Sequence, residues 1–257
     1  STQYFNSKVI IIFTVIIMTS LWLSENKLPQ FPTLHGEIKT DVLIIGGGLC
    51  GILCANELKK LGVDYTLVEA ERICQKTSGN TTAKITSQHS LIYDSITKKY
   101  GTEAAEKYYR INEKAIEEYA RLCKDIDCSF ERKSNYIYTL SDFKKSEKEM
   151  ETLQKIHAKA KLVPSLSELP FDVLGAIKFE NQAQFDPVAF ISAITSEMNI
   201  YENSRVLGFD GRYYYGKDFR IKADKVIVAT HFPIFNKHGA FSLKLYQHRS
   251  YVIALKN

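Results

Sequence analysis

The sequence lacks the cysteine patterns that mark metal-binding and disulfide-rich proteins. Its five cysteines are an odd number, and none of them forms a Cys-x-x-Cys pair. Cys50 and Cys54 are four residues apart, but no histidine or further cysteine stands nearby to complete a zinc site. We therefore expect no metal site and interpret the thiols as small buried side chains, reduced as in a cytoplasmic protein. The five are Cys50, Cys54, Cys74, Cys123 and Cys128.

A strong excess of one charge is also missing. The formal net charge is +5 over 257 residues, and the lysines are interspersed with acids, as in residues 144–149. This pattern favours solvated helix faces over a nucleic-acid surface. A hydrophobic content of 45% and a charged content of 25% are ordinary for a globular protein. The length suits one large domain or two smaller ones, and the sequence has neither an internal repeat nor a low-complexity tract.

No apolar run is long enough by itself to cross a membrane. Residues 9–18 are apolar and the run extends at most to residue 23, whereas a spanning helix needs roughly 20 residues. Three interpretations stay open: a non-native or disordered extension ahead of a start at Met18, a membrane anchor over residues 9–23, and a signal peptide. No small-x-small cleavage site follows the run, and the chain begins with Ser1 rather than methionine.

What the sequence does contain is a glycine-rich turn in a favourable context. Residues 41–51 read as a buried strand, a Gly-x-Gly-x-x-Gly turn and the first turn of a helix. A helix-compatible run covers residues 52–61, and Gly62 stands at the position of a C-cap. A second apolar strand, residues 65–68, ends at Glu69, roughly 20 residues beyond the glycines, where a ribose-binding acid is expected.

These residue types suit the pyrophosphate of a dinucleotide. Gly46 permits a tight turn, Gly48 lets the backbone approach the phosphates, and Gly51 lets the helix lie close to the sheet. The helix N-terminus offers free N–H groups and a positive dipole end to the anion. A carboxylate at Glu69 would bind the ribose hydroxyls and repel a 2′-phosphate, which favours FAD or NAD over NADP.

The remainder alternates between helical and strand patterns. Periodicity predicts helices over residues 97–123 and 144–161 and strands over residues 130–140, 171–179 and 223–230. Asp186 and Pro187 form an N-cap pair that begins a helix reaching about Met198. Turn signals at residues 210–211 and 215–217 separate short strands. The stripe expected to pack into the core consists of Ala105, Tyr108, Ile111, Ala115, Tyr119 and Leu122.

With these elements the sequence resembles the D-amino-acid oxidase and glycine oxidase superfamily of FAD-dependent oxidoreductases. Within that superfamily it is most similar to the bacterial group that carries a C-terminal Rieske domain. The resemblance extends from about residue 28 to the end. The glycine turn identifies only the superfamily, whereas residues 81–86 and 229–233 are specific to the group. The matching segments are residues 28–32, 41–51, 69–72, 81–86, 185–187 and 229–233.

The resemblance implies an α/β fold, with an FAD/NAD(P)-binding Rossmann-like domain and an inserted, incomplete α+β substrate domain. It divides the chain into an N-terminal apolar segment and extended arm (1–38), the FAD-binding domain (39–128 and 183–240), the substrate-domain insertion (129–182) and the start of a truncated substrate-domain sheet (241–257). The family's later part, which completes the substrate pocket, and the Rieske ligands, which are paired Cys and His, are missing from this sequence. The resemblance therefore implies a C-terminally truncated chain.

The resemblance also assigns residues to the cofactor. It implies that Glu69 faces the adenosine ribose, that Arg72 lies near the adenine end, and that the backbone of Val206 meets the adenine. The loop of residues 77–83 would approach the pyrophosphate and flavin. A solvated turn is the alternative for that loop, and a plain buried strand residue is the alternative for Val206. The full set of implied cofactor-binding residues is Gly46, Gly48, Leu49, Cys50, Gly51, Glu69, Ala70, Arg72, Thr77, Ser78, Thr81, Thr82, Ala83, Val206, Ala229 and Thr230.

The implied reaction is oxidation of an amine or amino-acid C–N bond by hydride transfer to flavin N5, with oxygen or a Rieske cluster as electron acceptor. No catalytic residue is assigned. Lys84 and His89 follow the flavin-facing loop, although an ordinary surface lysine is the favoured interpretation of Lys84, and structural packing that of His231. Two alternatives remain: a truncated FAD-binding fragment without activity, and an NAD-dependent dehydrogenase.

Overall fold

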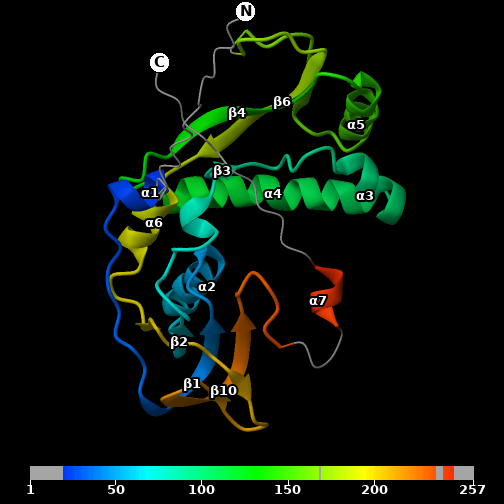
Figure 1. The fold of residues 1–257 in the computed structure, drawn as a ribbon. Helices are drawn as coiled ribbons and strands as arrows, with labels where there is room; N and C mark the ends of the chain where they lie inside the picture. The colour runs from blue at the N-terminus through cyan, green and yellow to red at the C-terminus, as the bar shows by residue number, and fades with distance from the viewer. Residues whose placement is uncertain (1–19, 168, 236–239, 246–257) are drawn as a thin grey trace, which may run out of the picture.

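The computed structural model describes residues 20–167, 169–235 and 240–245. Two β-sheets lie at opposite ends of the molecule, with helices α2 (Leu49–Lys60), α4 (Thr102–Leu122) and α6 (Pro187–Ile194) between them (Figure 1). One sheet has parallel strands at its centre, and the other is antiparallel. The α/β fold expected from the sequence is therefore confirmed.

The first sheet has the strand order β7-β2-β1-β10-β9-β8. β1 (Gly36–Ile45) lies at its centre and pairs in parallel with β2 (Tyr65–Val68) on one side and β10 (Phe219–Val228) on the other. The apolar residues 42–45 are at most 7% exposed, because a central parallel strand is covered on both faces. The edges are formed by the short strands β7 (Ile200–Tyr201) and β8 (Gly208–Phe209), and the equally short β9 (Tyr214–Tyr215) lies between β8 and β10.

Helix α2 (Leu49–Lys60) connects β1 to β2 and packs against the sheet through Gly51, Ile52 and Ala55. It ends as the sequence predicts: Gly62 follows the last turn with φ of +66°, and its N–H donates to Lys59 O. Glycine adopts this left-handed conformation without steric cost, so it terminates the helix. The predicted β-α-β unit is confirmed.

The second sheet is built around β6 (Gly175–Gln184), which pairs antiparallel with every other strand of the sheet. Its neighbours are β3 (Lys84–Ile85), β4 (Glu131–Thr139) and β5 (Ala160–Val163). Ile177 and Phe179 of β6 pack with Tyr93 and Leu153 from the covering helices. The chain then enters α6 (Pro187–Ile194), where Asp186 Oδ1 accepts hydrogen bonds from the N–H groups of residues 188 and 189. The predicted N-cap is confirmed, although the helix ends before Met198.

The long helix predicted over residues 97–123 is two helices. α3 (Tyr93–Tyr100) and α4 (Thr102–Leu122) are separated by Gly101, whose φ is +88°. The predicted core stripe is also wrong in part, because Ile111 is 56% exposed and Ala115 is exposed, whereas Tyr109 and Ile116 are buried. Two successive steps of three residues, as from 105 to 111, rotate a helical stripe by roughly 120°, so it leaves the buried face.

The helix predicted to reach residue 161 also ends early. α5 (Phe143–Lys155) stops where His157 takes a φ of +56°, and the chain turns into β5. Residues 160–163 are also compatible with a strand, and their pairing with β6 makes them a strand instead of the end of a helix. The strand predicted at residues 171–179 begins only at Gly175.

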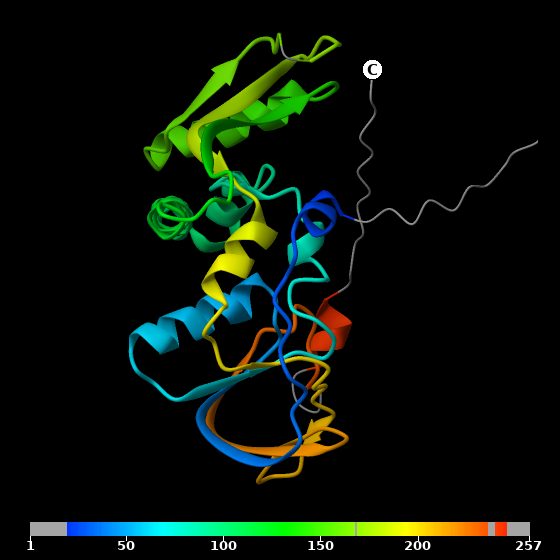
Figure 2. The same cartoon turned by 90° about the vertical axis from the view of Figure 1, so that its left-hand side faces the viewer.

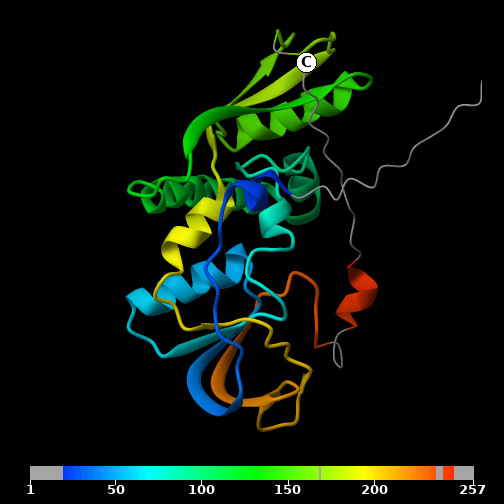
Figure 3. The same cartoon turned by 60° about the vertical axis from the view of Figure 1, so that its left-hand side comes forward.

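The N-terminal arm begins with α1 (Leu21–Glu25), which contacts the 3-10 turn η1 (Ser78–Asn80) and α6. The arm then runs down to the start of β1 in the first sheet (Figures 2 and 3). Trp22 and Leu23 pack against the main hydrophobic cluster, and Trp22 Nε1 donates to Thr81 O at 2.8 Å. The end of the apolar run is therefore used in packing, while residues 9–19 lie outside the described part. Within residues 20–167, 169–235 and 240–245, none of the helices combines the length and apolar character needed to span a bilayer.

Candidate functional site

The glycine turn leaves no space for side chains between the strands and α2. Gly46 has a φ of +115°, and a Cβ on it would lie 2.6 Å from Ala229 O at the end of β10. A Cβ on Gly51 would lie 2.0 Å from Gly46 O. Both distances are far below van der Waals contact, so only glycine permits this approach of turn, helix and neighbouring strand.

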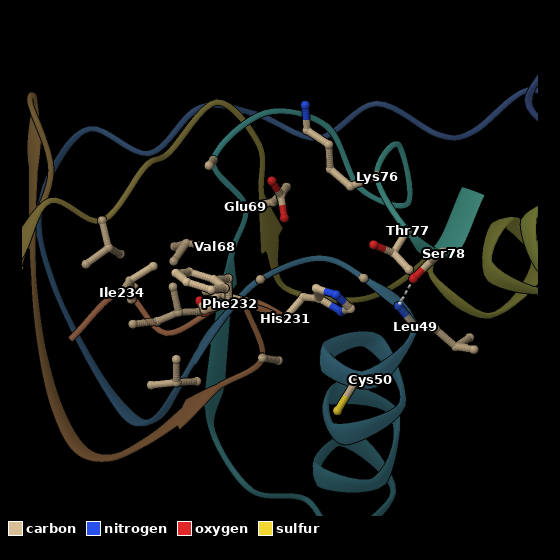
Figure 4. A pocket seen from close by; sticks show the side chains of 18 of the residues that line it. Leu49, Cys50, Val68, Glu69, Lys76, Thr77, Ser78, His231, Phe232 and Ile234 are labelled. Carbon is tan, nitrogen blue, oxygen red and sulfur yellow. Dashed lines mark hydrogen bonds between the residues drawn. The ribbon is translucent and has the colours of Figure 1, made fainter. Parts of the chain in front are cut away.

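Side chains from other segments accept hydrogen bonds from the backbone N–H groups of this turn. Gly47 N–H donates to Glu69 Oε2 at 2.7 Å, and Leu49 N–H donates to Ser78 Oγ at 2.9 Å. Gly48 is the N-cap of α2 and has no side chain to satisfy the helix N-terminus. The N-terminal end of α2 therefore presents N–H donors and a positive dipole end toward Ser78 (Figure 4).

A cavity of about 1210 Å³ opens in front of this helix end. Most of the residues implied for the cofactor line it together, although they come from four separate segments. They are Gly46, Gly48, Leu49, Cys50, Glu69, Ala70, Arg72, Thr77, Ser78, Val206, Ala229 and Thr230. Val206 is half-buried and lies outside any strand, which contradicts the alternative of a buried strand residue.

Four of the implied residues lie outside the lining of the cavity. Gly51 lies behind the turn, where it sets the packing of α2. Thr81 accepts the indole N–H of Trp22 at its carbonyl, Thr82 is exposed, and Ala83 is buried with a φ of +58°. Thr81 also accepts a hydrogen bond from Ala83 N–H at its hydroxyl, and none of these three residues lines the cavity.

The three side chains that the sequence offers for chemistry are placed differently. Lys84 on β3 is exposed and does not line the cavity, as expected for a surface lysine. His89 also lies outside the lining; its Nδ1 is 2.8 Å from the Tyr108 hydroxyl, and burial lowers its pKa. His231, in contrast, is exposed to solvent and lines the cavity, so its interpretation as a packing residue is wrong.

An ion pair that the sequence does not indicate holds one wall of the cavity. Glu202 is 1% exposed, and its Oε1 accepts from Ile73 N–H at 2.8 Å. Its Oε2 lies 3.2 Å from Arg72 Nε, and Arg72 Nη2 donates to Pro29 O at 2.9 Å. A buried carboxylate needs such compensation, and the pair also ties the N-terminal arm to the segment after β2.

The rim beside Val206 carries a cluster of exposed charges. Lys76 Nζ lies 2.7 Å from Glu71 Oε2, and Arg205 Nη2 lies 3.6 Å from Glu71 Oε1. The hydrogen bond from Lys76 lowers the pKa of Glu71. Lys76 and Arg205 line the cavity without having been expected from the sequence, although each directly precedes an implied cofactor residue.

The thiols differ more than the sequence suggested. Cys74, Cys123 and Cys128 are buried, and burial raises the pKa of Cys74 and of Cys123 to about 12. Cys50 is exposed and lines the cavity, so its interpretation as a buried side chain is wrong. Among the described residues, no group of three or more His, Cys, Asp or Glu side chains could hold a metal ion.

Comparison with known proteins gives a family match over most of the chain. The family model described as FAD dependent oxidoreductase matches residues 41–257. The chain is 33% identical over 248 residues to the putative Rieske 2Fe-2S iron-sulfur protein YhfW of Bacillus subtilis (strain 168), covering 91% of this chain and 48% of that protein. It is 37% identical over 82 residues to gamma-glutamylputrescine oxidoreductase of Escherichia coli (strain K12), covering 32% of this chain and 19% of that protein.

Solved structures share the fold at low sequence identity. L-proline dehydrogenase from P. horikoshii superposes with a TM-score of 0.61 at 20% identity, over 78% of this chain and 54% of that one. L-amino acid deaminase from Proteus vulgaris gives a TM-score of 0.57 at 17% identity, over 80% of this chain and 50% of that one. The chain thus spans about half the length of YhfW and of these two structures.

Proposed function

Because the chain belongs to the family of FAD-dependent oxidoreductases, we propose that it binds FAD in the cavity at the glycine turn and oxidises an amine or amino-acid C–N bond. The family match covers residues 41–257, which include every segment that lines the cavity. The substrate class is supported by the names of relatives that act on amino acids or an amine, among them L-proline dehydrogenase and gamma-glutamylputrescine oxidoreductase.

The close packing at Gly46 and Gly51 is the observation that carries this proposal. It brings the N-terminal end of α2 directly to the cavity, where backbone N–H groups suit a pyrophosphate. Glu69 Oε2 and Ser78 Oγ already accept from two of these N–H groups, which is the role that phosphate oxygens would take. The residues present therefore fit the charge and the shape of the cofactor.

Each wall of the cavity has a proposed task. Gly48, Leu49 and Cys50 hold the pyrophosphate together with Thr77 and Ser78, and the Glu69 carboxylate accepts from the ribose hydroxyls. Ala70, Arg72 and Val206 form the adenine end, while Ala229 and Thr230 close the other side. Thr81 and Ala83 anchor the loop that carries Ser78.

When bound, FAD supplies an acceptor for a hydride at flavin N5, and the protein orients the substrate. The described residues that line the cavity include the apolar side chains of Phe232, Ile234 and Phe241. We propose that the electrons pass on to dioxygen or to a Rieske cluster; the second acceptor is supported by the name of the Bacillus relative. The five free cysteines support a reducing, cytoplasmic location.

The test uses the purified full-length protein. We expect one FAD per chain by flavin absorbance, and bleaching of that absorbance under anaerobic conditions by members of a panel of amines and amino acids. Glycerol 3-phosphate, which has no C–N bond, serves as the control substrate, since a solved structure of the same fold is named L-alpha-glycerophosphate oxidase. Bleaching by this control alone, or binding of NAD without flavin, would contradict the proposal. The yield of hydrogen peroxide under air distinguishes dioxygen from an iron–sulfur acceptor.

A further inference from the structure

His231 is held in a strained turn at the end of β10. Its φ of +64° lies in the left-handed region, which is unfavourable for residues other than glycine. The turn is fixed on both sides, because Phe232 N–H donates to Thr230 O and Thr230 Oγ1 donates to Phe232 O, each at 2.7 Å. Strain retained in this way at the edge of a cavity points to a function for the side chain that it displays.

The turn directs the imidazole of His231 into the cavity. The ring is exposed and, in Figure 4, extends toward the region between Leu49 at the start of α2 and Ser78. This is the region in which the proposed function places the pyrophosphate. The lysine and arginines that line the cavity are held in ion pairs: Lys76 and Arg205 with Glu71, and Arg72 with Glu202.

We propose that His231 is a cofactor-binding residue, whose imidazolium form contacts the FAD pyrophosphate and makes FAD affinity rise as the pH falls. This inference rests on the proposed function, since it requires FAD in this cavity. An imidazole changes its charge between about pH 5 and 8. The protonated ring attracts the diphosphate and the neutral ring does not, so lower pH strengthens binding and bound FAD favours the protonated ring.

Other ionisable groups also line the cavity, and the variants described below leave all of them unchanged. Burial raises the pKa of Cys74 and of Tyr119 to about 12, so both groups stay neutral while an imidazole titrates. Among the charged groups of the lining, Glu71 is paired with Lys76 and Arg205, and Arg72 is paired with the buried Glu202. The groups that line the cavity from each element are Cys50, Glu69, Glu71, Arg72, Cys74, Lys76, Tyr119 and Arg205.

The experiment measures the Kd of FAD for the full-length apoprotein at pH 5.5, 6.5 and 7.5 by quenching of flavin fluorescence. The test variant is His231→Asn, because asparagine tolerates a positive φ. His157→Asn is the matched control: His157 is also exposed and has a φ of +56°, but it lies outside the cavity, after α5. His231→Lys keeps a positive charge throughout, and His231→Gly relieves the strain. Circular dichroism and thermal melting establish that each variant is folded.

For the natural protein and for His157→Asn we expect FAD to bind roughly three- to tenfold more tightly at pH 5.5 than at pH 7.5, as one charge near a partly solvated diphosphate gives. His231→Asn and His231→Gly should lose this ratio and bind with the weaker Kd, whereas His231→Lys should bind with little change over pH. An unchanged pH ratio in folded His231→Asn overturns the inference while leaving FAD binding intact. Absence of FAD binding in the natural protein at every pH overturns the proposed function itself.

Discussion

Replacing Gly51 by alanine tests the packing on which the cofactor cradle depends. The new Cβ would lie 2.0 Å from Gly46 O, 3.2 Å from Gly46 C and 3.4 Å from Ala229 Cβ. Only the last of these is an ordinary contact, so α2 and the glycine turn must separate by roughly 1 Å or more to reach normal contact distances. Overpacking of this kind costs about 1–3 kcal/mol of stability. The higher helix propensity of alanine offsets about 0.5–1 kcal/mol of that cost.

We expect Gly51→Ala to lower the free energy of unfolding by about 2 kcal/mol and to weaken FAD binding by at least roughly tenfold, because the displaced N–H groups no longer meet the pyrophosphate. Urea denaturation gives the first value and fluorescence titration with FAD gives the second. Asn56→Ala, at a half-buried position of the same helix, is the control for propensity alone. If Gly51→Ala matches Asn56→Ala in both measurements, the argument from close packing is refuted.

The other predictions concern the walls of the cavity. Glu202→Gln should destabilise the protein by about 1–3 kcal/mol in urea denaturation, because it removes the buried carboxylate that accepts from Ile73 N–H and pairs with the half-buried Arg72, whereas Glu197→Gln, in an exposed pair, should change stability by less than about 1 kcal/mol. Trp22→Phe should cost about 1 kcal/mol through loss of the indole hydrogen bond to the loop, and retention of the full melting temperature would contradict that. A maleimide at pH 7.5 should modify Cys50 first and leave Cys74 unmodified in the folded protein, since burial raises the pKa of the second thiol; saturating FAD should slow the reaction of Cys50, as measured by mass spectrometry.

The local part of the site could be predicted from the sequence. Strand, glycine turn, helix and acid follow one another within residues 41–69, and each step obeys a short-range rule about turns, caps or hydrophobic runs. The N-cap at Asp186 could be predicted for the same reason, because capping also follows a short-range rule. The break at Gly101 could have been found too, because a glycine within a helical pattern is a signal to stop.

The rest depends on contacts between distant segments, which no local pattern encodes. The carboxylate of Glu202 meets the N–H of Ile73 across 129 positions of sequence, and nothing near Glu202 marks it as buried. β5 is a strand only because β6 offers it a partner. The direction of the His231 ring follows from hydrogen bonds of its two neighbours, which become predictable only when the strand end is known.

The contact between Gly46 and the end of β10 has a consequence for the order in which the protein folds. During synthesis β1 and α2 leave the ribosome long before β10, and until then one side of β1 has no strand to pair with. Formation of this long-range parallel pair closes a very large loop, a slow step in folding. The unpaired edge of β1 is in the meantime open to aggregation. Production of the protein should therefore benefit from low temperature or chaperones, and we expect FAD to bind only after β1 has paired with β10.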